Sequence, residues 1–289
     1  MRHLLCWLIF IPMAVAADWR IDHATIAGPN LENLRSLLAP VGVTTEYGGP
    51  HSSGLTEMAI TAFADGSYLE LIAWRGLRAP HAGQSWAQFL DQQAGPCAWA
   101  IQAPDIGAET GRLKAAGISV TETVRGGRVR PDGVKLEWET AGIGPGDRGS
   151  LFPFLIHDFT PRDRRVYPSG KPTTQEYFGI SLVVIGVRDL NAAVAQYRRA
   201  FGLPVPEKQL DGQFGATLAR FTGTPVVLAE PLDAKNWLAT RLDRFGDAPC
   251  AFVLAGWRPA PGSTRWFGQN VRWFDAPQFH GMRLGATVP

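Results

Sequence analysis

The stretch that decides the fold covers residues 21–74 and reads IDHATIAGPNLENLRSLLAPVGVTTEYGGPHSSGLTEMAITAFADGSYLELIAW. Its two ends, residues 21–26 and 67–72, are short runs rich in β-branched and apolar residues with turn signals beside them, which predicts β-strands. Side chains alternate between the two faces of a strand, so His23 and Glu70 each stand among apolar neighbours on one face. A carboxylate in such surroundings is costly unless a cation or a hydrogen-bond donor compensates it. We therefore interpret Glu70 as the first indication of a site.

A helix and two further strands are predicted between these ends. Asn30 is a good N-cap, and leucines recur at helical spacing over residues 31–38 before Pro40 and a glycine end the run. Residues 43–47 and 57–63 then have the composition of strands. The predicted order is β-α-β-β-β, with His23 on the first strand and Glu70 on the last.

The same order recurs along the chain. Units of this kind are predicted to start near residues 20, 96, 179 and 248, and Asp105 and Asp189 are N-caps equivalent to Asn30. The fourth unit is eroded, because Pro259 and Pro261 stand where its helix is expected.

This repeat predicts an α+β fold whose βαβββ modules form curved mixed sheets around a pocket. We expect two paired-module halves, residues 18–160 and a degenerate second half at 178–289. Residues 161–177 are polar and contain prolines, which is typical of a linker.

The chain opens with the features of an export signal. A short basic start, residues 1–3, is followed by an apolar run over residues 4–15 and by a small-residue cleavage pattern at 14–16. We expect residues 1–16 to be removed and the mature protein to be periplasmic or secreted. A retained anchor and a buried N-terminal strand are the alternatives.

Composition narrows the classes of partner and of chemistry. The net charge is +2, and no basic stripe alternates with aromatic residues, which argues against a nucleic-acid partner. After residue 16 no segment is long and apolar enough to predict a membrane span.

Cys97 and Cys250 occupy equivalent places in two repeats, which suggests matching buried environments, although a disulfide between them is the alternative. The sequence contains no phosphate loop, nucleophile elbow, HExxH or CxxC motif.

Several motifs resemble one known family. The chain is similar to the vicinal-oxygen-chelate superfamily, which includes glyoxalase I, bleomycin-resistance proteins and extradiol dioxygenases, and within it to the glyoxalase-like domain branch. The similar residues are Asp22-His23, Gly48-Gly49-Pro50-His51, the run at 65–71, and later runs at 128–133, 136–138 and 152–156.

The resemblance implies a cup-shaped sheet and a divalent metal such as zinc, iron, nickel or manganese. In that superfamily each module supplies one ligand from its first strand and one from its last. His23 and Glu70 fill both positions of the first module, but the second module has Ala98 and Phe154 there. The corresponding positions of the second half are apolar as well, with Leu182, Val227 or a neighbour, and Ala251.

The candidate site residues each have an alternative reading. His23 and Glu70 form an acid–base or metal-binding site, or a buried hydrogen-bonded pair. His51, on a glycine-rich loop, is a third ligand, a substrate contact, or a histidine that caps a turn. Arg128 and Arg130, together with a nearby arginine, bind a substrate carboxylate or form a solvated hairpin rim.

Tyr68 shares the face of Glu70 and contacts the substrate or packs in the core. The function expected from these residues is an exported enzyme of lyase, isomerase or dioxygenase type, acting on a small oxygenated substrate through His23 and Glu70. The alternative is a non-catalytic protein that binds or sequesters a small molecule. The sequence predicts no oligomeric state.

Overall fold

The structure is a computed structural model of the chain, and it describes residues 19–76, 86–92, 95–257, 263–274 and 282–288. Within these ranges the elements follow the predicted repeat. The first module consists of β1 (Ile21–Ala27), α1 (Leu31–Leu38), the 3₁₀ helix η1 (Ala39–Val41), β2 (Glu46–Pro50), β3 (Thr56–Ala62) and β4 (Tyr68–Trp74). After α2 (Ala87–Asp91), the second consists of β5 (Gly95–Gln102), α3 (Ile106–Ala115), β6 (Val124–Val129), β7 (Lys135–Ala141) and β8 (Phe154–Asp158).

The second half repeats this order. After α4 (Arg162–Val166) come β9 (Tyr177–Gly186), α5 (Leu190–Phe201), β10 (Glu207–Asp211), β11 (Ala216–Arg220), β12 (Val226–Pro231) and α6 (Trp237–Phe245). The last module consists of β13 (Ala248–Gly256), β14 (Thr264–Trp266), β15 (Gln269–Trp273) and β16 (Arg283–Val288). The eroded helix predicted around Pro259 and Pro261 lies outside the described residues.

The predicted start points of the helices are confirmed. The side chains of Asn30, Asp105 and Asp189 each accept a hydrogen bond from the backbone N–H three residues later, at 2.9, 2.8 and 2.9 Å. These bonds satisfy donors that have no partner inside the helix. The start of β2 is three residues later than predicted, at Glu46.

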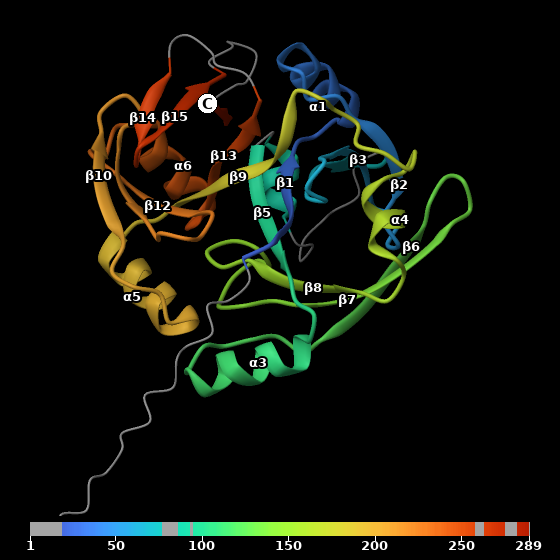
Figure 1. Cartoon of the computed structure of the whole chain (residues 1–289), viewed down its shortest axis with the longest axis horizontal. Coiled ribbons are helices and arrows are strands. Elements are labelled where there is room, and N and C mark those ends of the chain that lie inside the picture. The colour runs from blue at the N-terminus through green and yellow to red at the C-terminus, as the bar shows by residue number, and fades with distance from the viewer. Residues whose placement is uncertain (1–18, 77–85, 93–94, 258–262, 275–281, 289) are drawn as a thin grey trace, which may run out of the picture.

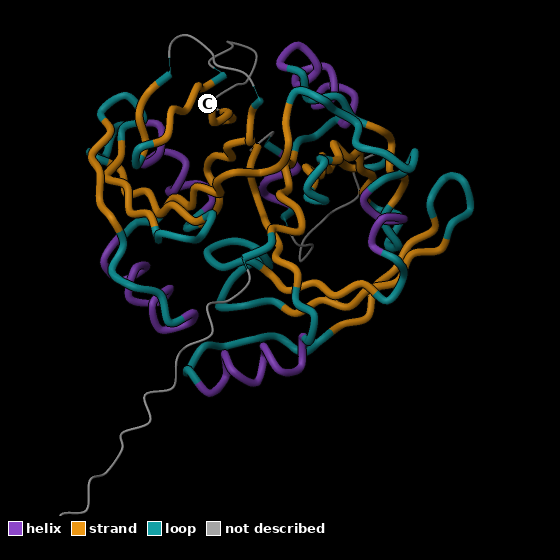
Figure 2. Tube along the Cα trace, in the orientation of Figure 1, coloured by secondary structure: helices purple, strands orange, loops and turns teal. Residues whose placement is uncertain are grey.

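The sixteen strands in the described residues form two eight-stranded sheets of the same order, β2-β3-β4-β1-β5-β8-β7-β6 and β10-β11-β12-β9-β13-β16-β15-β14. In each sheet the two first strands of the modules pair antiparallel, and each first strand pairs parallel with the last strand of its own module. Figure 1 shows the two curved sheets side by side. They meet at their central strands, which are β1 and β5 in the first sheet and β9 and β13 in the second. The helices α1, α3 and α5 lie at the outside of the molecule, whereas α6 lies among the strands of the second half (Figure 1 and Figure 2).

One apolar cluster joins the two halves. Trp99 and Leu155 from the first sheet, and Val183 and Phe252 from the second, belong to the same buried cluster. Tyr197 of α5 is fully buried in it, and its hydroxyl donates to the carbonyl of Leu151 in the first half at 2.5 Å. The convex backs of the sheets therefore share a core, and each concave face points away from it. None of the helices in the described part of the chain has the length and apolarity that crossing a membrane requires.

The cysteines Cys97 and Cys250 are both buried and free. A disulfide between them is therefore absent from the structure, and the interpretation as matching buried positions fits.

The shared core predicts that the two halves unfold together. Tyr197→Ala removes a buried ring and its bond to Leu151, so we expect the free energy of unfolding to fall by about 3–5 kcal/mol. Thermal and denaturant unfolding should remain a single transition when followed by both tryptophan fluorescence and far-UV circular dichroism. The exposed aromatic Tyr47 supplies a control, because Tyr47→Ala should change stability by less than about 1 kcal/mol. Two separate transitions, only one of them shifted by Tyr197→Ala, would contradict a common core.

Candidate active site

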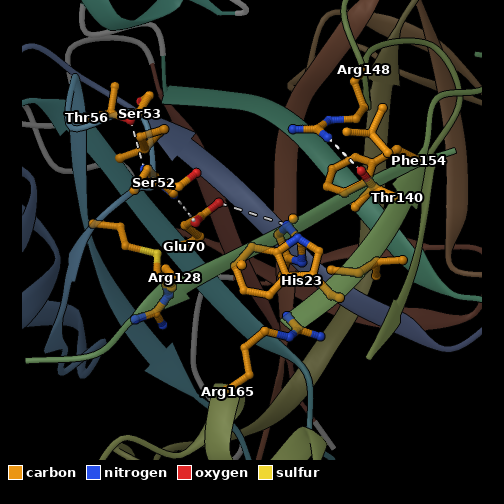
Figure 3. A pocket seen from close by; sticks show the side chains of 18 of the residues that line it. His23, Ser52, Ser53, Thr56, Glu70, Arg128, Thr140, Arg148, Phe154 and Arg165 are labelled. Carbon is orange, nitrogen blue, oxygen red and sulfur yellow. Dashed lines mark hydrogen bonds and ion pairs between the residues drawn. The ribbon is translucent and has the colours of Figure 1, made fainter. Parts of the chain in front are cut away.

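A cavity of about 360 Å³ opens on the concave face of the first sheet. It is where the strand alternation predicts it, since His23 on β1 and Tyr68 and Glu70 on β4 all face it (Figure 3). The register explains why they meet, because His23 pairs with Tyr68 and Thr25 with Glu70 across two parallel strands. The lining side chains with polar or charged groups are His23, His51, Ser52, Ser53, Thr56, Tyr68, Glu70, Arg125, Arg128, Thr140, Arg148 and Arg165, and the large aromatic ones are Trp74, Trp86, Trp138 and Phe154.

Glu70 is buried but well compensated. Its carboxylate accepts a hydrogen bond from the Thr25 hydroxyl at 3.2 Å and one from His51 Nε2 at 3.2 Å. Burial alone would raise the pKa of Glu70, but the hydrogen bond and charge of His51, the charge of His23 and the Thr25 hydroxyl together lower it to about 2. The side chain is therefore an ionised acceptor at neutral pH.

His51 lies at the end of the glycine-rich turn, and the structure brings it into the site. Because the ionised Glu70 accepts only, the Nε2 of His51 carries the proton between them. Its Nδ1 lies 2.8 Å from the Thr56 hydroxyl, so both ring nitrogens have partners. His51 is thus held against Glu70, and the same hydrogen bonds also close the turn before β3.

His23 is oriented by its neighbour in sequence. A shift in the pairing of β1 with β5 lies between Ile21 and His23, and the carboxylate of Asp22 is fully buried beside the ring. The Nδ1 of His23 lies 2.6 Å from Asp22 Oδ1, and its Nε2 lies 3.9 Å from Glu70 Oε2, beyond hydrogen-bond distance. Since Asp22 is an acceptor only, Nδ1 carries the proton and Nε2 faces the cavity with its lone pair.

Asp22 is in turn held by two arginines from α4, within the segment predicted as a linker. Arg165 donates to both oxygens of Asp22, at 3.0 and 2.8 Å, and Arg162 donates to the same carboxylate. Arg165 also binds Asp158 at the end of β8. Burial by itself would raise the pKa of Asp22, but Arg165, His23 and Arg162 hold it well below its usual range. Residues 161–177 therefore do more than connect the halves, because α4 closes the base of the site.

Tyr68 lies in the wall of the cavity and does not titrate near neutral pH. Its ring stacks on His23 with the centroids 4.8 Å apart, and its hydroxyl accepts a hydrogen bond from Arg165 at 2.7 Å. Burial raises the pKa of Tyr68 well above its ordinary value, and the nearby Asp22 and Glu70 raise it further against the opposing charge of Arg165.

The three arginines of the predicted hairpin separate into different roles. The interpretation of Arg128 as a solvated rim residue is wrong, because it is only 6% exposed, lines the cavity and donates to the carbonyl of Gly48 at 2.5 Å. Arg130 does not line the cavity and binds Asp132 and the carbonyl of Arg164 instead, so a substrate contact is not supported for it. Arg125 lies at the cavity over the ring of Phe159, at 4.7 Å. Turn chemistry indicates where a hairpin bends but not which side chain folds back under it.

Arg148 is a cavity residue that the sequence did not single out. It comes from the loop between β7 and β8, and its guanidinium lies 4.7 Å from the ring centroid of Phe154 and 3.0 Å from the Thr140 hydroxyl. The adjacent Gly149 has φ +82°, and a Cβ there would lie 2.8 Å from the backbone nitrogen of Trp99, so only glycine lets the loop approach β5 so closely. That glycine was a signal available in the sequence.

A divalent metal would need a set of converging donors. In the described residues no group of three or more His, Cys, Asp or Glu side chains is arranged to hold a metal ion. Both ring nitrogens of His51 are in use, and the register places Ala100 opposite Phe154 where Thr25 stands opposite Glu70, so Phe154 is the counterpart of Glu70. The donor set therefore does not fit a resident metal.

The second sheet has no equivalent cup among its described residues. Its concave face is filled by a buried cluster that includes Leu182, Val227 and Ala251, the positions equivalent to the ligands, with Phe214 and Trp266 packed over them. Glu230, at the end of β12, accepts a hydrogen bond from the backbone of Leu190 at 3.0 Å and so caps α5. The site belongs to the first half.

Comparisons with known proteins agree with the fold. The model of a protein family described as "Glyoxalase-like domain" matches residues 21–201 of this chain. A hypothetical protein from Staphylococcus aureus has a similar fold over 92% of this chain and 98% of its own, with a TM-score of 0.63 and 16% identity. A mutant of 4-hydroxymandelate synthase from Streptomyces coelicolor covers 93% of this chain and 92% of its own, with a TM-score of 0.55 and 11% identity. At these identities the likeness shows the fold alone. A search of curated proteins found no significant match.

The lowered pKa of Glu70 predicts how stability depends on pH. The carboxylate titrates at about 2 in the folded protein against 4.5 in the reference state, so its stabilising contribution is complete above 4.5 and is lost as the pH falls towards 2. Glu70→Gln has no such group, and we expect the slope of unfolding free energy against pH between these values to become smaller. Urea unfolding from pH 5 to pH 2.5 measures it. Glu137→Gln, which removes an exposed carboxylate, should leave the wild-type slope; equal slopes in wild type and Glu70→Gln would refute the assignment.

Proposed function

Because the chain belongs to the glyoxalase-like domain family, we propose that it is an enzyme that moves protons on a small oxygenated substrate bound in the cavity of the first sheet. The reaction type is that of a lyase or an isomerase. His23 is the proton-transferring group, and Glu70, held in place by His51, binds the substrate beside it.

The observation that carries the proposal is the Asp22–His23 pair. The 2.6 Å bond from Nδ1 to a buried, ionised carboxylate fixes the ring and its tautomer, and leaves Nε2 free to take a proton from the substrate. When His23 becomes an imidazolium, it lies between the carboxylates of Asp22 and Glu70, which stabilise the charge.

Glu70 has a different role, since a carboxylate with a pKa of about 2 is a weak base. It is an ionised acceptor that holds the His51 imidazole and the Thr25 hydroxyl, and it is in place to accept a hydrogen bond from a substrate hydroxyl. His51 donates its Nε2–H to Glu70 and so holds the carboxylate at this point. Together they orient an oxygen of the substrate next to His23 Nε2.

The metal that the family resemblance implies takes no part in this proposal. The residues that would hold it are His23, Glu70 and His51. Nε2 of His23 is free, but both ring nitrogens of His51 are in use, which leaves only two of the three side chains as donors. Acid–base chemistry needs only these side chains, so proton transfer should persist in the presence of EDTA.

Non-catalytic binding of a small molecule is the second candidate. It is favoured by the apolar Phe154 at the position equivalent to Glu70, which leaves the second module without a polar group from its last strand. A binding protein of this kind would keep the cavity but exchange no protons.

Hydrogen exchange distinguishes the two without knowledge of the product. A panel of small hydroxy- and oxo-compounds is incubated with the protein in D₂O, with EDTA present, and the loss of carbon-bound hydrogen is followed by NMR. We expect one class of compound to exchange with the wild type, and the rate to fall about 100-fold or more in His23→Gln. His157→Gln is the control, because His157 does not line the cavity. Saturable binding with no exchange of any compound would establish the binding protein, and exchange that occurs only when EDTA is left out would sink the acid–base proposal.

Export is part of the proposed function, although residues 1–16 lie outside the described residues. The basic start, the apolar run and the small-residue pattern support it. Expression of the full chain in a bacterial host should yield a periplasmic protein whose intact mass begins at Ala17. A cytoplasmic product that retains Met1 would contradict this.

A further inference from the structure

Arg148 is a cation in the cavity without an acidic partner in the described structure. Its Nη1 donates to Thr140, and none of the described acidic side chains forms an ion pair with it. Burial lowers the pKa of Arg148 and the charge of Glu70 opposes this, yet a guanidinium remains charged at any physiological pH. Arg148 is half-buried, and a charge partly removed from water without a partner is costly, so a ligand that supplies the opposite charge gains from it.

The side chain is held in advance of any ligand. The guanidinium lies over Phe154 at 4.7 Å and near the ring of Trp86 at 5.5 Å, which covers its flat face. The loop is fixed to the same tryptophan, since the Trp86 indole donates to the carbonyl of Arg148 at 3.1 Å and its backbone N–H to Asp147 at 3.2 Å. A stacked guanidinium with one nitrogen bonded still presents the Nε–Nη2 edge, which matches the two oxygens of a carboxylate.

The charges around the cavity give the charge of the missing group. Arg162 and Arg165 are balanced by Asp22 and Asp158. That balance leaves the buried Arg128 and the half-buried Arg148 facing the cavity against Glu70, a surplus of about one positive charge when the histidines are neutral. Arg125 also lines the cavity, but its side chain is exposed, so solvent screens its charge. Arg128 is bonded to Gly48, and its Nη2 is buried out of reach of a ligand, so Arg148 is the group able to bind.

We propose that Arg148 binds the carboxylate of a monoanionic substrate, on the wall of the cavity opposite Glu70. Figure 3 shows Arg148, Thr140 and Phe154 on one side, Glu70 on the other and His23 between them. A substrate anchored at Arg148 therefore extends its oxygenated carbon towards His23 and Glu70, and the walls at Trp86 and Trp138 favour a flat apolar body. The inference rests on the proposed function, because it names the substrate class of that same site.

The number of charges favours a carboxylate over a phosphate monoester. A phosphate carries close to two negative charges at neutral pH and three acceptor oxygens. One guanidinium edge and a surplus of about one charge match a carboxylate, and Glu70 would repel a second negative charge.

Calorimetric titration of the mature protein tests the proposal with defined probes: acetate, benzoate and phenylacetate, with benzamide as a neutral isostere and phenyl phosphate as the alternative anion. We expect a monocarboxylate to bind more tightly than benzamide, and Arg148→Met to weaken this binding about tenfold or more. Arg148→Lys, which keeps the charge but not the fork, should lie between them. Arg125→Met is the matched control, because Arg125 borders the same cavity over Phe159 and should keep wild-type affinity.

Four results would overturn the proposal. The first is that the wild type binds no monocarboxylate, and the second is that a folded Arg148→Met variant binds with the affinity of the wild type. The third is that Arg125→Met loses as much affinity as Arg148→Met, and the fourth is that phenyl phosphate binds more tightly than benzoate. Arg148→Lys keeps the test decisive if the methionine variant fails to fold. The proposed function is tested separately by Glu70→Gln and His23→Gln: carboxylate binding that survives in both, without proton exchange in the wild type, would refute the function and leave the anion site standing.

Discussion

The buried ion pair between Asp22 and Arg165 is the interaction on which the site depends. It joins β1 to α4, and Arg165 carries it on to Asp158 at the end of β8, so three segments distant in sequence meet at one carboxylate. Removing one partner would leave the other charge buried, which costs about 3–5 kcal/mol in comparable pairs. The same carboxylate fixes the His23 ring at 2.6 Å, and the orientation of the chemistry is therefore set by the interaction that closes the base of the cup.

The fold follows from local signals in the sequence, and so do the first members of the site. Alternation along two short strands places His23 and Glu70 on one face, and the parallel pairing of β1 with β4 then brings them to one cavity. The N-caps and the repeated element order are equally local, because each is decided within a few residues. His51 was found through its glycine-rich turn.

What the sequence did not show depends on contacts between distant segments. Arg165 sits in a polar, proline-bearing stretch typical of a linker, and only the folded chain places it beside Asp22, 143 positions away. Arg148 lies in a glycine-rich loop whose path is decided by its approach to β5. Asp22 was part of the similar motif, but its role as the orienting carboxylate follows from a shift in strand pairing that composition does not encode. Burial of Arg128 beneath its hairpin is of the same kind.

The concave face of the second sheet is filled, whereas that of the first sheet is open, so stability and ligand binding depend on different residues. Trp266 and Phe214 give that half a continuous apolar interior, so a substitution there is felt through folding alone. The charged side chains that line a cavity, and that weaken a core, lie in the first half. The second half is therefore constrained by stability alone, while the first half carries the buried charged groups of the candidate site.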